Sequence, residues 1–573
     1  MKGREIIIKS LEREGVEVIF GYPGGASMEI HQALTQSKQI RMLLPRHEQG
    51  ASFAAGGYAR ATGKPGVCLA TSGPGATNLI TGIMDAKMDS IPMIALTGQV
   101  PTGVIGTDAF QECDIVGATF PCVKHSFLVQ DIKDIPSIVP EAFLIATTGR
   151  PGPVLIDFPK NIQQMDCEKD FDFEPKVKHK GFSVNTSPAK RQLQNALKLI
   201  ENAERPIIYG GGGIISSEAS DALRSFIKKT GIPITTTVTA LGCYPEDDPL
   251  SLHMLGMHGA VYANIAINRA DLVIVLGARF DDRVTGNLSE FCKDAKIIHV
   301  DIDASEINKN KIVEVPIQGD VKETLEALNL SVKKCKIDPW IKQVQAWKEE
   351  FKHSYTTSKD AIAPQAVIRK ISELAPKDSI VSVGVGQHQM WTAQFYGFKT
   401  PRSWLSSSGL GSMGFGLPAA LGAQVAFPNR TVIDIDGDGS FLMNIQELQT
   451  LKVENIPVKC VILNNEYLGM VAQWEDIFYE SVRGHTYIGK ANFADIAKSF
   501  GIAGATISKP EEVEPAIKEM LAHKGPYVLD VKYPYDDNSH GHVIPMIPTN
   551  STYLDSILPG GVKLSDYWEK KGQ

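Results

Sequence analysis

Short spacing between cysteines is what this sequence most clearly lacks. Its eight cysteines are scattered through 573 residues, and no two of them form a Cys-x-x-Cys pair. That distribution disfavours a zinc site, an iron–sulfur cluster and a disulfide scaffold, and it is typical of a protein in a reducing compartment. We therefore interpret the cysteines as small buried side chains.

The chain also lacks long apolar runs and an excess of basic residues. No stretch of about 18 apolar residues could cross a bilayer, and the formal net charge is −7. We therefore expect neither a membrane nor nucleic acid as a partner. The opening "MKGREIIIKSLEREGVEVIFGYPGG" has neither the apolar core of a signal peptide nor the acid-poor composition of a transit peptide. We expect a cytoplasmic protein.

Three blocks of the sequence repeat the order strand, Gly-rich turn and helix. They cover residues 1–166, 189–345 and 364–545, with a charged linker at 167–188 and a tail at 546–573. The first and third blocks end alike, in "GRPGPVLIDFP" and "HKGPYVLDVKYP", which suggests a weak internal duplication. Alternating strands and helices predict an α/β fold of three doubly wound parallel sheets, with binding sites at the carboxyl ends of the strands.

The segment "DIDGDGSF", residues 434–441, is the most informative motif. Gly437 and Gly439 permit a sharp turn and a close ligand approach between a strand and a helix, whose free N–H groups favour phosphate oxygens. Asp438 would repel a diphosphate unless a cation lay between them, and Mg²⁺ suits such an oxygen-only site. Asn444 and Glu447 resemble a capping box. Phe441, Leu442, Ile445, Leu448 and Leu451 would share one helix face.

The next apolar strand, "PVKCVILNN", delivers Asn464 and Asn465. The interval after Asp438 is long enough for a helix and a parallel return strand, so Asp438 and Asn465 should end at neighbouring strand tips. A "GDG" alone is as compatible with an ordinary turn. "GDGS" followed by a helix, a strand and "NN" favours a divalent cation holding a diphosphate.

This pattern resembles the thiamine-diphosphate motif, and nearly the whole chain, from "GYPGG" to "MIP", resembles the large catalytic subunit of acetohydroxyacid synthases (acetolactate synthases). The resemblance implies a pyrimidine-binding, a central FAD-binding and a diphosphate-binding domain. It implies metal binding by Asp438, Asn465 and the backbone carbonyl of Tyr467. Further positions matching the thiamine-diphosphate site are Gln387, His388, Gly411, Met413, Gly437, Gly439, Ser440, Gly469 and Met470.

Glu48 opens an Ala/Gly-rich helix, where alone it would be read as a charge that compensates the helix dipole. The resemblance instead implies that it hydrogen-bonds the aminopyrimidine ring and promotes the imino tautomer. It implies that Met413 is wedged beneath the cofactor; a core methionine is the alternative. It also implies that the two halves of one site come from different chains, in a homodimer or a dimer of dimers.

The middle block contains "YGGGGI", whose glycines lack the G-x-G-x-x-G spacing and alone predict only a turn. The resemblance implies FAD with a structural part in this block. The matching positions are Arg150, Gly212, Met254, Leu255, Gly256, Met257, His258, Gly277, Arg279, Asp281, Arg283, Asp301, Ile302 and Asp320.

The activity implied is decarboxylation of pyruvate and condensation of the remaining two-carbon unit with pyruvate or 2-ketobutyrate. The products, 2-acetolactate and 2-aceto-2-hydroxybutyrate, feed valine, leucine and isoleucine synthesis, and the family usually has a small regulatory subunit. Phe110 and Gln111 match substrate positions; Arg283 and Trp474 match the acceptor site. Arg283 could instead form a surface ion pair with Asp281 or Asp282, and Trp474 could be a core residue.

Two rival functions remain open at this point. One is an FAD- and thiamine-diphosphate-dependent oxidoreductase of the pyruvate oxidase kind, and the other is a catalytically silent regulatory relative. Glu48, Asp438, Asn465 and Met413 argue against the silent relative. Glu48 also argues against glyoxylate carboligase, whose matching position is not acidic.

Overall fold

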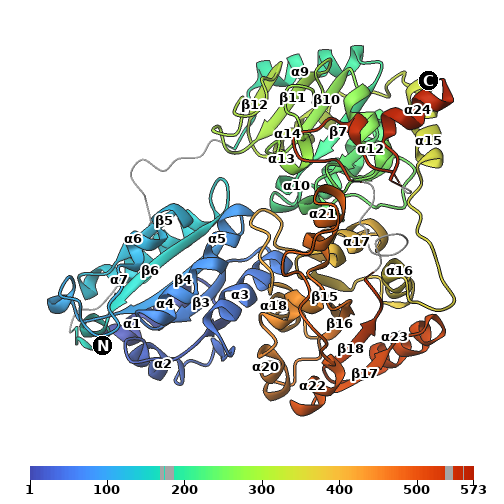
Figure 1. Ribbon diagram of the computed structural model, residues 1–573. Coiled ribbons are helices and arrows are strands. Elements are labelled where there is room, and N and C mark those ends of the chain that lie inside the picture. Colours follow the sequence, from blue (N-terminus) through green and yellow to red (C-terminus); the bar gives the residue numbers. More distant parts are fainter. Residues whose placement is uncertain (168–172, 174–185, 536–545, 559–560, 573) are drawn as a thin grey trace.

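A computed structural model of the protein describes residues 1–167, 173, 186–535, 546–558 and 561–572. Its strands form three separate six-stranded parallel sheets, each flanked by helices (Figure 1). We refer to the units built on them as domains one, two and three. Their predicted boundaries remain predictions, and most of the expected linker at 167–188 lies outside the described residues.

Domain one carries its sheet in the order β2-β1-β3-β4-β6-β5. Its strands are β1 (Val18–Gly21), β2 (Arg41–Leu43), β3 (Gly66–Ala70), β4 (Met93–Gln99), β5 (His125–Leu128) and β6 (Pro153–Pro159). Its helices are α1 (Gly3–Arg13), α2 (Met28–Leu34), α3 (Glu48–Thr62), α4 (Pro74–Asn78), α5 (Ile80–Met88), α6 (Ile115–Thr119), α7 (Ile135–Thr147) and α8 (Lys160–Gln164).

Domain two has the strand order β12-β11-β10-β7-β8-β9. Its strands are β7 (Pro206–Gly210), β8 (Ile234–Thr236), β9 (Ser251–Met254), β10 (Leu272–Leu276), β11 (Lys296–Asp301) and β12 (Val315–Gln318). Its helices are α9 (Lys190–Asn202), α10 (Gly213–Ser216), α11 (Ser220–Thr230), α12 (Val261–Arg269), α13 (Asp282–Thr285), α14 (Val321–Asn329) and α15 (Asp338–Glu350). This is the strand order of dinucleotide-binding folds.

Domain three has the order β14-β13-β15-β16-β18-β17, which repeats that of domain one strand for strand and supports the expected duplication. Its strands are β13 (Ile380–Val383), β14 (Trp404–Leu405), β15 (Val432–Gly437), β16 (Lys459–Asn464), β17 (Ala503–Ile507) and β18 (Tyr527–Lys532). Its helices are α16 (Pro364–Leu374), α17 (Gln387–Phe395), α18 (Gly416–Ala426), α19 (Asp438–Leu442), α20 (Glu447–Val453), α21 (Gly469–Phe478), α22 (Phe493–Ser499) and α23 (Val513–Ala522).

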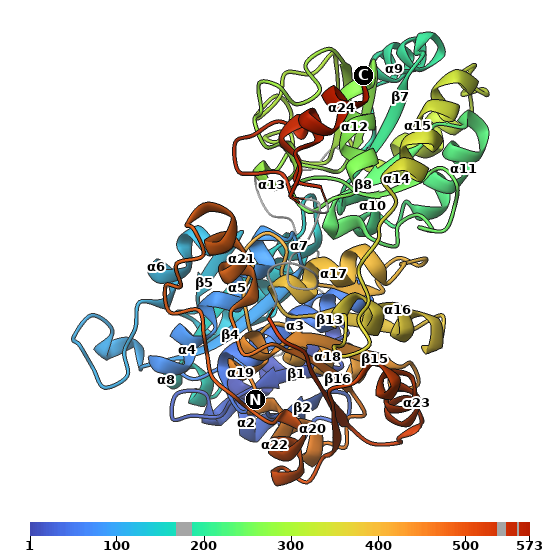
Figure 2. The same cartoon turned by 45° about the vertical axis from the view of Figure 1, so that its right-hand side comes forward.

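Central strands of each sheet are buried along their whole length, as in β6, β10 and β16. Continuous apolar strands are what a parallel sheet covered by helices on both faces requires. The last helix, α24 (Leu564–Lys571), returns to domain two, where Leu564 packs with Val261 and Ile265 of α12 (Figures 1 and 2).

Domains one and three share one hydrophobic core, in which α3 lies against α18. The rings of Phe53 and Phe415 meet edge to face with centroids 5.4 Å apart. Gly57 and Gly422 let the two helices approach, because a Cβ on either would collide with a backbone carbonyl of the other helix. This close packing fixes the first turn of α3, and Glu48 with it, relative to domain three.

The helix predicted after Asp438 is broken into α19 and α20. Phe441, Leu448 and Leu451 are buried as expected, but Leu442 is 40% exposed, so the single-face prediction was wrong there. The predicted capping box was also wrong. Asn444 donates to the carbonyl of Gly414, and Glu447 accepts from the backbone of domain one, because both side chains serve tertiary contacts.

Candidate active site

The carboxyl ends of β13 and β15 form the edge where the strand order of domain three reverses. Ligands of open α/β sheets bind at such switch points. Two predicted cofactor residues begin helices here: Gln387 opens α17 after β13, and Asp438 opens α19 after β15. The fold therefore brings together two motifs that are 51 residues apart in sequence (438 − 387).

Asp438 and Asn465 meet at adjoining strand tips, because β15 pairs with β16 in parallel register. Asp438 is 4% exposed, and its carboxylate accepts hydrogen bonds from the N–H groups of Gly439 (3.0 Å) and Glu466 (2.6 Å). The Asn465 side-chain oxygen accepts from Tyr467 N at 3.0 Å. Burial raises the pKa of the Asp438 carboxyl to about 7. A divalent cation would reverse that effect by stabilising the carboxylate.

The loop around Met413 is tied to the start of α19 by Ser440. The Ser440 hydroxyl accepts from Gly414 N (3.0 Å) and Val385 N (3.4 Å). A Cβ on Gly439 would lie 3.6 Å from the Met413 methyl carbon, and one on Gly437 would press on the His388 ring. Glycine at both positions therefore lets the side chains of His388 and Leu468 pack closely on this strand-to-helix turn, which we call the cradle. Gly411, with φ +73°, lies on the loop beside this turn, and the half-buried Met470 lies on the helix beside it.

Glu48 is the first residue of α3, and Asn78 donates to its carboxylate at 3.0 Å. Gln49 lies 3.4 Å from the side-chain amide of Asn444, which donates to Gly414 O beside Met413. The start of α3 thus lies against the Met413 loop of the same chain. The expectation that Glu48 serves a site in a second copy stays a prediction.

Several residues of this region were not found from the sequence. Asn78 binds Glu48, Gln473 accepts from Gln387 at 2.9 Å, and Asp436 lies 3.2 Å from His388 Nε2. Alternation along "DIDGD" places Asp436 on the same strand face as Asp438, which could have indicated it. Asn78 and Gln473 carry no comparable signal, because their partners are set by packing between helices.

A second cavity, of about 440 Å³, lies at the switch point of domain two, between the ends of β7 and β10. The predicted FAD residues that line it are Arg150, Gly212, Gly277, Arg279, Asp281, Arg283, Asp301, Ile302 and Asp320. The segment Met254, Leu255, Gly256, Met257 and His258 is not among its lining residues. Arg150 reaches it from domain one and pairs with Glu306 at 2.6 Å.

Comparison with known proteins agrees with this geometry. Residues 1–118, 193–328 and 384–531 match the thiamine pyrophosphate enzyme N-terminal TPP binding, central and C-terminal TPP binding domains. The chain is 52% identical to "Acetolactate synthase 3, chloroplastic" of Brassica napus, covering 98% of this chain and 87% of that protein. It is 51% identical to "Acetolactate synthase, chloroplastic" of Arabidopsis thaliana (98% and 85%) and 52% identical to "Acetolactate synthase 1, chloroplastic" of Zea mays (98% and 89%).

This chain belongs to the acetolactate synthase family of thiamine pyrophosphate enzymes. Among its described residues, no helix is long and apolar enough to span a bilayer.

The four residues predicted to contact substrate come from all three domains. Gln111 has φ +60° and packs on Gly73, directly before the helix that carries Asn78, whereas Phe110 is 87% exposed. Arg283 lines the second cavity, and its Nε lies 3.9 Å from the Asp282 carboxylate, at the outer limit of the alternative ion pair. Trp474 is half-buried on α21 and meets Phe478 edge to face.

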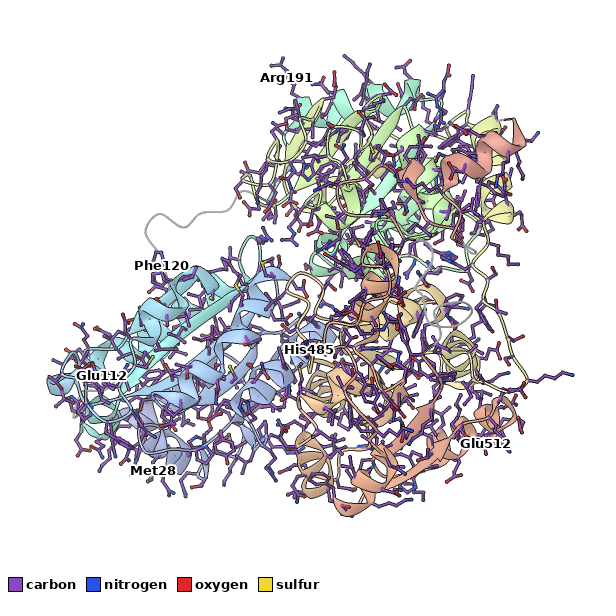
Figure 3. The ribbon with its side chains drawn as sticks, in the orientation of Figure 1. Met28, Glu112, Phe120, Arg191, His485 and Glu512 are labelled. Atoms are coloured by element: carbon purple, nitrogen blue, oxygen red, sulfur yellow. The ribbon has the colours of Figure 1, made fainter. Side chains whose placement is uncertain are left out.

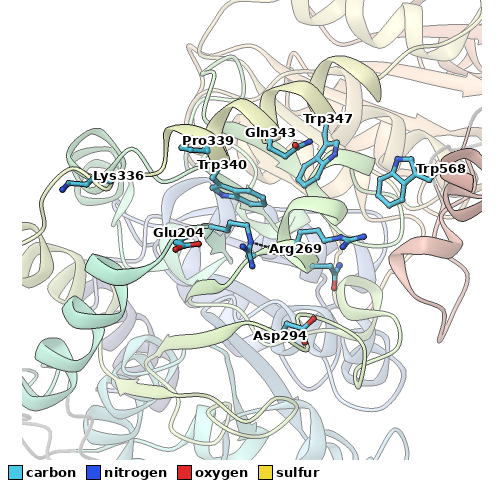
Figure 4. Close-up of a pocket in the computed structure, with 12 residues that line it drawn as sticks. Glu204, Arg269, Asp294, Lys336, Pro339, Trp340, Gln343, Trp347 and Trp568 are labelled. Carbon is cyan, nitrogen blue, oxygen red and sulfur yellow. Dashed lines mark hydrogen bonds between the residues drawn. The ribbon is translucent and has the colours of Figure 1, made fainter. Parts of the chain in front are cut away.

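A third cavity, of about 810 Å³, lies apart from both sites, between α15, α24 and the loops of domain two (Figure 4). Trp340, Trp347 and Trp568 line it beside exposed Arg205 and Arg269. None of the residues assigned to the acetolactate synthase site lies in this groove.

Proposed function

We propose that this protein decarboxylates pyruvate and joins the two-carbon remainder to a second 2-keto acid, giving 2-acetolactate from pyruvate or 2-aceto-2-hydroxybutyrate from 2-ketobutyrate. The observation that carries the proposal is the convergence of Asp438, Asn465 and the backbone of Glu466 and Tyr467 at the strand tips of domain three. The relatives named acetolactate synthase support it at about half identity over nearly the whole chain.

Mg²⁺ and thiamine diphosphate fit the residues at this edge. A buried carboxylate on Asp438, the Asn465 amide oxygen and the Tyr467 carbonyl are all oxygen donors, as Mg²⁺ prefers. Gln387, His388 and Ser440 surround the glycines of the cradle and would hold the diphosphate. When bound, the cofactor supplies an electron sink for the carbon that loses CO₂.

The protein's own residues would orient the reactants and move protons. Glu48, held by Asn78, would exchange a proton with the pyrimidine ring, which is general acid–base work. Met413 would support the cofactor from below. Gln111, Arg283 and Trp474 would bind the carboxylate and alkyl groups of the 2-keto acids, with Phe110 closing the site.

FAD fits the cavity of domain two for a separate reason. The cavity opens at the topological switch of a sheet with dinucleotide-binding strand order, and Arg150 and Arg279 offer positive charge for a diphosphate. Because Arg150 also joins domain one to domain two, FAD would brace the two domains. We assign it this structural part and no net redox step.

Assembly as a homodimer or a dimer of dimers, with sites shared between copies, is supported by exposed apolar side chains on domain one. Phe110 is 87% and Phe120 78% exposed, and Phe120 projects from the domain's outer edge (Figure 3). Such side chains mark interaction surfaces when they gather. We further propose a small regulatory subunit and a cytoplasmic location; the relatives named above are chloroplastic, so cell fractionation must decide the compartment.

The deciding assay incubates the purified protein with thiamine diphosphate, Mg²⁺, FAD and pyruvate. We expect acetolactate, one CO₂ for every two pyruvates and no oxygen uptake. Oxygen consumption with one CO₂ per pyruvate would establish the pyruvate oxidase alternative. No turnover at all would favour the silent relative.

A further inference from the structure

Side chains of the segment from Asn444 to Thr450 in domain three contact the turn that leads into α3. Asn444 lies in the turn between α19 and α20, whereas Glu447 and Thr450 lie three residues apart on one side of α20. Thr450 Oγ1 lies 3.5 Å from Leu44 O, Glu447 accepts from Arg46 N, and Asn444 lies 3.4 Å from the Gln49 side chain. Domain three therefore contacts residues on both sides of Glu48.

Glu447 lies at the centre of this contact and is fully buried. Its two carboxylate oxygens accept from Arg46 N at 2.9 and 3.1 Å, and the Thr450 hydroxyl donates to it at 2.7 Å. A Cβ on Gly50 would collide with the carboxylate, so Gly50 is what lets the α3 turn approach so closely. Buried carboxylates are costly unless such donors satisfy them, so a buried acid kept here requires a reason.

We propose that Glu447 is a positioning residue for Glu48. It accepts the backbone N–H of Arg46, two residues before Glu48, and abuts Gly50, two residues after it, and so it sets where the Glu48 carboxyl points into the cofactor site. The inference rests on the proposed function, because it concerns the proton exchange assigned to Glu48.

The expected effect follows from geometry. Glu447→Gln preserves the size of the side chain but turns an NH₂ group toward donors that need an acceptor. The turn should then shift, and a misplacement on the order of 1 Å can cost roughly 100-fold in rate. Cofactor affinity depends mainly on Asp438 and Asn465 in domain three, so it should change little.

The test measures exchange of the thiazolium carbon proton of bound thiamine diphosphate by NMR, together with cofactor affinity by fluorescence titration. We expect Glu447→Gln to slow exchange about 10–100-fold while its affinity stays within about threefold of the parent. The matched control is Glu454→Gln. Glu454 also joins domain three to domain one, through Arg41 at 2.8 Å, but away from Glu48, so exchange should be unchanged.

A second variant keeps the inference testable if Glu447→Gln folds poorly. Gly50→Ala keeps Glu447 itself but displaces its carboxylate, because the added methyl group would collide with it, so exchange should slow in the same way. In the double variant, exchange should be no slower than in the slower of the two single variants, since both substitutions act on one contact. Parental exchange in both single variants, or multiplying effects in the double variant, would overturn the proposal.

If Glu447 only held domains one and three together, the measurements would give a different result. Affinity, melting temperature and exchange would then fall together, and would do so in Glu454→Gln as well; that result would also overturn the proposal. Failure of the proposed function is separate, because it would show as absence of acetolactate from the unmodified protein.

Discussion

Asp438 is the residue on which the metal assignment depends. Its carboxylate is buried, is fixed by two backbone N–H groups and lies where Asn465 and the Tyr467 backbone converge. We expect Asp438→Ala to weaken thiamine-diphosphate binding by at least about 100-fold, or roughly 2.7 kcal/mol, because the cation loses its charged ligand. Titration with Mg²⁺ present measures this, with circular dichroism to confirm the fold. If Asp438→Ala bound thiamine diphosphate as tightly as the parent, Asp438 would not be the metal ligand.

Glu246 is a buried acid that the proposed chemistry does not use. Burial raises its pKa from 4.5 to about 8, and only its Oε2 has a hydrogen-bond partner, Phe398 N, among the described residues. Because the folded-state pKa lies above the unfolded one, its neutral form favours folding at low pH. That stability is lost as pH rises through about 8.

Glu246→Gln should therefore raise the melting temperature at pH 8.5 by about 2 °C and leave it nearly unchanged at pH 5. Asp247 and Lys348 are the charged neighbours that act on this acid, and both remain in the variant. A melting temperature that differs from the parent's equally at both pH values would contradict the burial argument.

Among the elements, α21 carries the expected acceptor specificity. It begins just after the Asn465–Tyr467 loop, and Trp474 presents a half-buried indole on its second turn. A rigid indole can contact the ethyl group of 2-ketobutyrate and gains little from the methyl group of pyruvate. One methylene is worth about 1–3 kcal/mol in such a pocket.

Trp474→Leu should form acetolactate at near the parental rate but largely lose any preference for 2-ketobutyrate. The measurement is the product ratio with both acids competing. Phe478→Leu, at the ring that Trp474 contacts, is the matched control for packing alone. An unchanged ratio in Trp474→Leu would make the tryptophan a packing residue.

The elements around Asp438 also show which parts of the local structure could be predicted from the sequence. Strand β15, the turn and the approach of Asn465 followed from apolar patterning and glycine placement. The break between α19 and α20 did not, because Asn444 and Glu447 bond to a loop and to another domain instead of capping their own helix. Local pattern cannot distinguish a polar residue that caps from one that reaches across a domain interface.

At the scale of the whole molecule, parallel sheets were predictable because strands alternate with helices along the sequence. The repetition of one strand order in domains one and three goes beyond the short similarity of their closing segments. Contacts such as Asn78 with Glu48, or α3 with α18, depend on how complete helices and domains pack. The spacing of residues in the sequence therefore does not predict them.

Mixing two inactive variants tests whether sites are shared between copies. If Glu48 of one chain serves Asp438 of another, unfolding and refolding Glu48→Gln together with Asp438→Ala should restore roughly a quarter of parental activity, because mixed dimers contain one intact site. Each variant refolded alone is the control. No restoration in a confirmed mixed dimer would assign each site to one chain, as the packing of α3 on α18 allows.

The most direct test of the account is the proton exchange that Glu48 is expected to promote on a cofactor bound by domain three. Exchange of the thiazolium carbon proton is followed by NMR in the parent and in Glu48→Gln, each saturated with thiamine diphosphate and Mg²⁺. We predict a fall of about 10²–10⁴, the scale for removing a positioned proton-transfer group, with little change in affinity. Exchange at the parental rate would contradict the account.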